Sequence, residues 1–176
     1  MYSKYDVMTK EIQLMSELSW WEKIKIEWRL KDKYSFEIKM LKIYLFRMNI
    51  ILEDLEEEDC DCTASDLAEI LIEDFLEHIR SKNSMEQLYQ ILESKKHYVE
   101  QDLHFSEDNE RYASISVKID RKTLRRVEVF FSDMSHSFTT HGYTADKLIS
   151  ILMCDYMKHY AEEPGQKLSL LKRRFS

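Results

Sequence analysis

The segment TASDLAEILIEDFLEHI, residues 63–79, recurs loosely as TADKLISILMCDYMKHY, residues 144–160. Seven of the seventeen aligned positions are identical, and the change from Phe75 to Tyr156 is one of several that keep apolar character. In each segment the apolar residues recur every three or four positions, which is the period of a helix with one buried face. We therefore expect both segments to be helices with equivalent roles.

Two further correspondences precede these helices in the same order. Residues 45–55 align with residues 124–134, and Tyr34 precedes the first match about as Tyr112 precedes the second. The sequence offset is nearly constant over all three matches. A period of about 80 residues is longer than a solenoid repeat, so it indicates two copies of one small domain or half-domain.

Alternation of apolar and charged residues predicts strands between the helices. Residues 23–31 alternate without a miss, as a half-buried strand does. Residues 34–55 also keep a helical spacing of three or four, so a helix there is the rival interpretation. The β-branched and aromatic residues at 127–131, in the aligned second copy, favour a strand. The expected strands are 23–31, 34–40, 45–54, 98–105, 112–120 and 124–133, and the expected opening helices are 3–18 and 84–96.

These elements predict an α+β fold made of two tandem copies of an α-β-β-β-α unit, which repeats after about 80 residues. The first copy would span residues 1–82, the second residues 83–163, and a basic C-terminal tail residues 164–176. Asn83 and Ser84 would form a short link between the copies. Because units of this size are marginally stable alone, we expect them to pack as one compact two-lobed body. Their sheets would join edge to edge or pack as separate lobes.

The bulk composition indicates a folded protein of the cytoplasm. Of the 176 residues, 44% are hydrophobic and 12% aromatic, which is enough for a core. Three cysteines, an odd number, and the lack of a leading basic and apolar stretch are typical of a reducing compartment rather than of a secreted disulfide framework. No run of 18 apolar residues occurs, so we expect no membrane span.

The charge of the chain is unevenly distributed. The net charge is −7, and residues 48–79 contain twelve acids but no Lys or Arg. Such a block repels nucleic acid and attracts a basic protein surface, although a solvated helix face has the same composition. Three nearby tryptophans would be core residues if buried and binding residues if exposed. The candidate partner-binding residues are Glu56, Glu57, Glu58, Asp59, Trp20 and Trp21.

Two cysteines, Cys60 and Cys62, come closest to a metal-binding motif. Structural zinc sites usually space their ligands two to four residues apart and need a second pair of ligands. The only other cysteine, Cys154, lies on the predicted helix 144–160. We therefore expect two reduced thiols and no metal site.

The polar loop of residues 133–141 is the best place for a catalytic site. It carries Asp133, His136 and His141, which are residue types that do acid–base work. No hydrolase motif surrounds them, and the absence of glycine before Gly142 excludes the common phosphate-binding loops. A small hydrolase-like enzyme at this loop is one alternative function, and no cofactor is expected.

Basic residues gather at the turn after residues 112–120 and in the tail. The order helix, three strands, helix resembles the topology of double-stranded RNA-binding domains, whose closing helix begins with basic residues that grip phosphate. Here the closing helices begin TASD at residues 63–66 and TADK at residues 144–147, so the resemblance covers topology only. Nucleic-acid binding is the other alternative function. Its candidate residues are Arg121, Lys122, Arg125, Arg126, Lys172, Arg173 and Arg174.

The leading hypothesis is a non-enzymatic cytoplasmic protein that binds another protein through a charge-polarised surface. It would act as an inhibitor, an adaptor, or an immunity or anti-defence factor. The expected partner is a protein with a basic surface, because a nucleic acid is disfavoured by the acidic net charge. We expect no membrane partner, and either a monomer or a homodimer.

Overall fold

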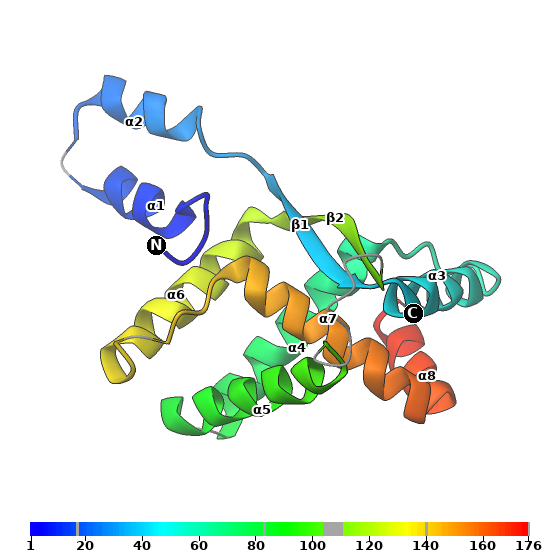
Figure 1. Cartoon of the computed structure of the whole chain (residues 1–176). Helices are drawn as coiled ribbons and strands as arrows, with labels where there is room; N and C mark the ends of the chain where they lie inside the picture. The colour runs from blue at the N-terminus through cyan, green and yellow to red at the C-terminus, as the bar shows by residue number, and fades with distance from the viewer. Residues whose placement is uncertain (17, 83, 104–110, 140, 176) are drawn as a thin grey trace.

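A computed structural model describes residues 1–16, 18–82, 84–103, 111–139 and 141–175. This part of the chain contains eight helices and two strands (Figure 1). In chain order they are α1 (Val7–Met15), α2 (Trp20–Glu27), β1 (Lys33–Leu41), α3 (Lys42–Glu56), α4 (Ala64–Lys82), α5 (Met85–Leu103), β2 (Tyr112–Asp120), α6 (Arg121–Ser137), α7 (Ala145–Glu162) and α8 (Pro164–Phe175). Among the described residues, none of the helices is both long and apolar enough to cross a membrane.

The two strands pair antiparallel along their whole length, from Lys33 opposite Asp120 to Leu41 opposite Tyr112. Because side chains of a strand point alternately to opposite faces, β1 buries every second residue. The buried side chains of β1 face the helices, while Glu37 and its alternate neighbours face solvent. The residues that β1 buries against the helices include Tyr34, Phe36, Ile38 and Met40.

Helices from the opposite half of the chain close the outer edges of this sheet. On β2, the Lys118 amide donates to Ser65 Oγ of α4 at 2.9 Å, and the Asp120 amide donates to Glu69 of α4. On β1, the Lys39 carbonyl accepts a hydrogen bond from Ser150 Oγ of α7 at 3.3 Å. Edge groups that would otherwise be open for pairing with another chain are therefore used. Each strand packs on a helix from the other half of the sequence.

The order strand, helix, helix, helix occurs twice along the described chain. Counted between first residues, the sequence offset from β1 to β2 equals the offset from α3 to α6. Glu37 and Ser116, which are separated by that same offset, lie opposite each other at the centre of the sheet. An approximate two-fold axis through this pair therefore relates β1 and α3 to β2 and α6.

The predicted α-β-β-β-α unit is wrong. Of the six expected strands, only those at 34–40 and 112–120 are strands. Residues 45–54 and 124–133 belong to the helices α3 and α6. The rival helical interpretation is therefore correct for 45–54, because α3 buries residues one helical turn apart, as does α6. The residues concerned are Tyr44, Met48, Ile51 and Leu55 in α3, and Leu124, Val127, Phe131 and Met134 in α6.

The remaining differences follow from the same error. Residues 23–27 are helical in α2, and residues 98–103 continue α5, while residues 104–105 and the link at Asn83 lie outside the described residues. The two segments predicted as closing helices are helices, α4 and α7. With one two-stranded sheet shared between the halves, the topological resemblance to double-stranded RNA-binding domains is lost.

The N-terminal helix α1 lies on α6 through a buried carboxylate. Glu128 of α6 is 1% exposed, accepts a hydrogen bond from the Met8 amide at 2.6 Å, and accepts another from Ser3 Oγ. Asp6 at the start of α1 makes no side-chain capping bond within the described chain, so Glu128 supplies the negative charge that a helix N-terminus favours.

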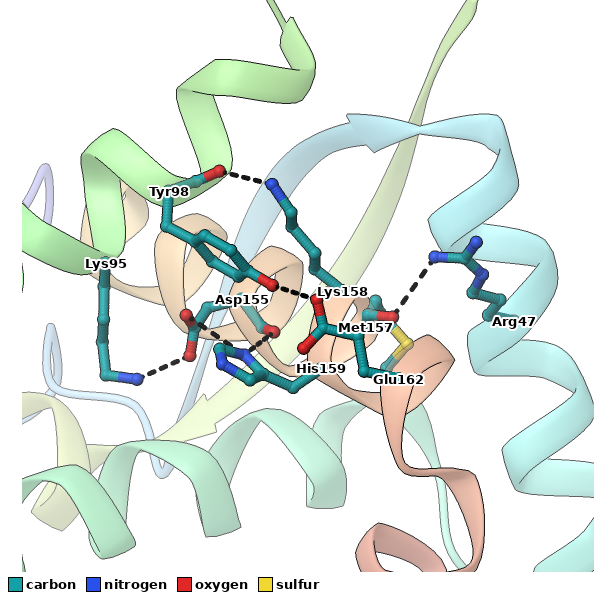
Figure 2. A network of polar contacts seen from close by, with 8 residues as sticks. All are labelled: Arg47, Lys95, Tyr98, Asp155, Met157, Lys158, His159 and Glu162. Carbon is teal, nitrogen blue, oxygen red and sulfur yellow. Dashed lines mark hydrogen bonds and ion pairs between the residues drawn. The ribbon is translucent and has the colours of Figure 1, made fainter.

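A polar network joins α5 to α7 (Figure 2). Lys95 Nζ lies 2.5 Å from Asp155 Oδ2, and Tyr98 donates from its hydroxyl to Glu162 at 2.6 Å. The ammonium group of Lys158 lies 3.8 Å from the ring centroid of Tyr98. From α3, Arg47 donates to the Met157 carbonyl at 3.4 Å. Because these polar groups bind one another, the network holds the helices together and is no candidate for a binding site.

We predict that Glu128→Ala destabilises the protein by about 1–3 kcal/mol, because the Met8 amide and the Ser3 hydroxyl lose their buried acceptor. Chemical denaturation would measure the loss, and hydrogen exchange would show faster exchange in α1. The control is Val129→Ala at the neighbouring, 41% exposed position, where a change within about 0.5 kcal/mol is expected. Unchanged exchange in α1 of Glu128→Ala would contradict this role.

Candidate functional site

The outer face of α3 carries an apolar stripe that is largely exposed to solvent. Ile43, Phe46 and Ile50 are 50%, 63% and 37% exposed and lie at the i, i+3 and i+7 positions of one helix face. Glu53 and Glu57 continue the same line and are exposed. We call these five residues the α3 surface. Contiguous exposed apolar side chains next to charges are typical of protein-binding sites.

Acids crowd the C-terminal end of α3. Glu56, Glu57, Glu58 and Asp59 are all exposed, and the last turn of α3 contains no basic residue. A helix C-terminus carries partial negative charge, so these carboxylates lie where they destabilise the helix. Of the four, Glu58 forms an ion pair with Lys172 of α8. The others present negative charge to solvent.

A hollow of about 270 Å³ lies beside this acidic end. It is lined by the six residues Asn49, Leu52, Glu53, Glu56, Asp61 and Cys62. Burial, with the nearby charge of Asp66 in second place, raises the pKa of the Cys62 thiol to about 12. A protonated thiol is a poor metal ligand. Within the described residues, no group of three or more His, Cys, Asp or Glu side chains is placed to hold a metal ion.

The two candidate tryptophans belong to a different surface. Trp20 and Trp21 lie on α2, are 66% and 68% exposed, and contact each other edge to face at 4.6 Å between ring centroids. α2 lies at the opposite end of the molecule from α3 (Figure 1). The residues predicted to bind a partner therefore form two separate surfaces.

Two of the candidate nucleic-acid residues at the start of α6 pair with one carboxylate. Arg121 Nε and Arg125 Nη1 each lie 2.7 Å from an oxygen of Glu11 on α1. Burial raises the pKa of Glu11, but the hydrogen bonds and charges of Arg125 and Arg121 outweigh it and leave the pKa below its usual value. A phosphate would have to displace this carboxylate. Arg126 lies 3.9 Å from Glu73, and Lys122 is exposed.

The basic tail also faces acids. Lys172 pairs with Glu58, and Arg174 pairs with Asp74 and lies 3.7 Å from Glu77. Arg173 is exposed. Because α8 and α6 emerge in different parts of the molecule (Figure 1), the tail and the α6 cluster do not form one basic surface.

The loop predicted as a catalytic site holds His141 in a structural role. His141 Nδ1 accepts the Tyr143 amide at 3.0 Å, so the proton belongs on Nε2, which faces Ser135 Oγ at 2.9 Å and the Phe131 carbonyl at 3.3 Å. Ser135 in turn donates to the Phe131 carbonyl at 2.9 Å and accepts from Tyr2 at 2.8 Å. In this tautomer His141 cannot take a proton from Ser135.

The prediction of a loop is wrong for residues 133–137, which form the last turns of α6, so the other two candidates lie on a helix. Asp133 is exposed, and His136 Nδ1 is 2.9 Å from the Ser132 carbonyl of its own helix. In the described part of the chain, neither makes a hydrogen bond or ion pair with His141. The three side chains therefore do not form an acid–base constellation.

The apolar stripe of α3 is the feature that the sequence interpretation missed. Alternation assigns residues 45–54 to a strand, in which Phe46 and Ile50 fall on the same face as Met48. A helical wheel separates Phe46 and Ile50 from Met48, which is fully buried. The stripe could therefore be found in the sequence as apolar residues at those positions of a helix that point away from its buried face.

Comparisons with protein-family models, with curated proteins and with solved structures each found no match. The functional argument therefore depends on the surface chemistry described above.

We predict that the free energy of unfolding falls as the pH drops below about 6.5, the usual pKa of histidine. Burial lowers the pKa of His141, so the folded state binds its proton less readily than the unfolded state. Protonation would also place a hydrogen on Nδ1, which could then no longer accept the hydrogen bond from the Tyr143 amide. In His141→Asn the side-chain oxygen can still accept that amide but does not titrate, so the slope between about pH 7 and pH 5 should shrink.

The matched control for this experiment is His136→Asn, which changes an exposed histidine in the last turn of α6. Denaturant unfolding at several pH values would measure the slope for each variant. An equal slope in wild type and His141→Asn would show that His141 does not carry the acid sensitivity.

Proposed function

We propose that this protein binds another protein through the α3 surface and its acidic end, and that it works by binding rather than by catalysis. The observation that carries the proposal is the exposed stripe of Ile43, Phe46 and Ile50 bordered by carboxylates. Leaving the Phe side chain and the two Ile side chains exposed to water costs about 1 kcal/mol or more for each of them. A partner that covers them recovers this free energy.

The chemistry of the α3 surface specifies the partner. Apolar side chains require an apolar contact, and the carboxylates at Glu53 and Glu57 require cations beside it. A basic and apolar protein surface meets both conditions, and its charges would raise the association rate. An inhibitor or adaptor role fits such a protein, and the three free cysteines suit the reducing cytoplasm that we propose as its location.

Capture from nuclease-treated native extract tests the proposal. Ile50→Glu places a charge in the apolar stripe and should abolish capture of the partner that the wild type retains. The matched control is Val129→Glu, because Val129 occupies the corresponding position of α6 and is also exposed, at 41%. A partner lost in both variants, or in neither, would remove the α3 surface from this role.

We further predict that Glu56→Gln with Glu57→Gln stabilises the protein while it weakens partner binding. Each change removes a negative charge from the C-terminal end of α3, which is worth about 0.3–1 kcal/mol at low ionic strength. Thermal unfolding would show a rise in Tm of about 2–4 °C per kcal/mol. The gain should shrink in high salt.

The control for this prediction has the opposite sign. Glu86 lies in the first turn of α5, where a negative charge stabilises a helix, so Glu86→Gln should lower Tm and leave binding unchanged. A fall in Tm for the double variant at Glu56 and Glu57 would contradict the dipole argument.

A further inference from the structure

The two halves of the fold differ in what covers their first helix. On α6, the helix α1 covers a face that includes Arg125 and Glu128. The approximate two-fold axis relates these residues to Phe46 and Asn49 of α3. Glu128 is 1% exposed under α1, whereas Phe46 is 63% exposed and Asn49 is also exposed. Of the α3 surface, only Phe46 has a counterpart on α6, Arg125, that pairs with α1, while Val129, the counterpart of Ile50, is exposed as Ile50 is.

The chain also contains a helix with no fully buried side chain. All eight residues of α2 are described, none of their side chains is buried, and the helix packs mainly on α1. Its N-terminal capping box satisfies the first turn, but a helix this short is marginal in water without packing. Trp21, Lys25 and Trp28 lie at the i, i+4 and i+7 positions of one face, and all three are exposed.

We propose that α2 of a second copy of this chain docks on the α3 surface. Trp21 and Trp28 would cover the apolar stripe, which needs large apolar side chains. Lys25 and Arg29 would then lie against Glu53 and Glu57. The face of α2 carries cations and the α3 surface carries carboxylates, and both have exposed apolar side chains. The two faces therefore complement each other in charge and in apolar contact.

A second copy is required because α2 and α3 lie at opposite ends of one molecule (Figure 1). Two antiparallel copies would form the contact twice, α2 of each on α3 of the other, which is a closed two-fold dimer. Since docking requires that the α3 surface binds protein, it rests on the proposed function. Self-association would hold this surface covered until a different partner displaces α2.

The first experiment follows association by mass and by fluorescence. Sedimentation velocity should show a shift from 21.3 kDa toward twice that mass as the concentration rises through the order of 1–100 µM. All three tryptophans, Trp20, Trp21 and Trp28, lie in or next to α2. Their emission should therefore move to shorter wavelength in step with the mass, and high salt should reduce both changes.

The second experiment separates the two halves of the contact. Trp21→Ser with Trp28→Ser removes the apolar side chains in and next to α2 that would dock, and Phe46→Glu places a charge in the α3 surface that would receive them. Each variant alone should dissociate at least about tenfold more readily than the wild type. A mixture of the two should form a heterodimer, since the intact α2 of one fits the intact α3 of the other. These positions are exposed, so thermal unfolding should show that both variants remain folded.

Three outcomes would overturn the proposal. A monomer at all concentrations with unchanged tryptophan emission would exclude docking. Association of the Phe46→Glu variant at wild-type strength would mean that α2 binds elsewhere, and association of the tryptophan variant at wild-type strength would mean that α2 takes no part. If wild type but not Ile50→Glu captures a different protein, the proposed function stands in any of these three cases. If the protein dimerises but captures no other protein, only the docking of α2 on α3 stands.

Discussion

The antiparallel pairing of β1 with β2 is the constraint on which the rest of the structure depends. A two-stranded sheet is not stable alone in water, so it must be covered on one face and closed at its edges. Here α4 closes the edge of β2 through Ser65 and Glu69, and α7 closes the edge of β1 through Ser150. Each half of the chain therefore completes the other. Opposing this is the entropy lost when two strands that are far apart in the sequence come into register.

The sheet also fixes where the functional helices begin. β1 runs into α3 and β2 runs into α6 without an intervening residue, so both helices start from corresponding ends of paired strands. Their backbones are equivalent, but their outer faces are not. Arg125 of α6 binds the acid Glu11 of α1, while α3 presents the exposed side chain of Phe46 at the equivalent position. The function that we propose lies in this difference, since fold alone assigns none.

The fold could be predicted from the sequence where one period dominates. The strands β1 and β2 alternate, and α4 and α7 repeat every three or four residues, so these four elements follow from the pattern. In α3 and α6 the β-branched and aromatic residues favour strands, but burial of Met48 and Val127 at helical spacing overrides that propensity. The sequence of α2 alternates between apolar and charged residues because none of its side chains is buried, so packing against a core does not impose a helical period on it. The acidic end is visible in composition, whereas the stripe through Phe46 requires the helix.

Two features of α3 oppose the stability of a single molecule. Carboxylates at a helix C-terminus are repelled by the helix dipole, and Phe46 and its neighbours remain in water. A purely basic ligand would offset the repulsion between the carboxylates and the helix dipole, but it would leave Phe46 exposed to water. A purely apolar ligand would cover Phe46 but would desolvate Glu53 without a counter-charge, which is costly. Only an amphipathic ligand with cations beside an apolar face relieves both, and a short helix such as α2 presents both on one side.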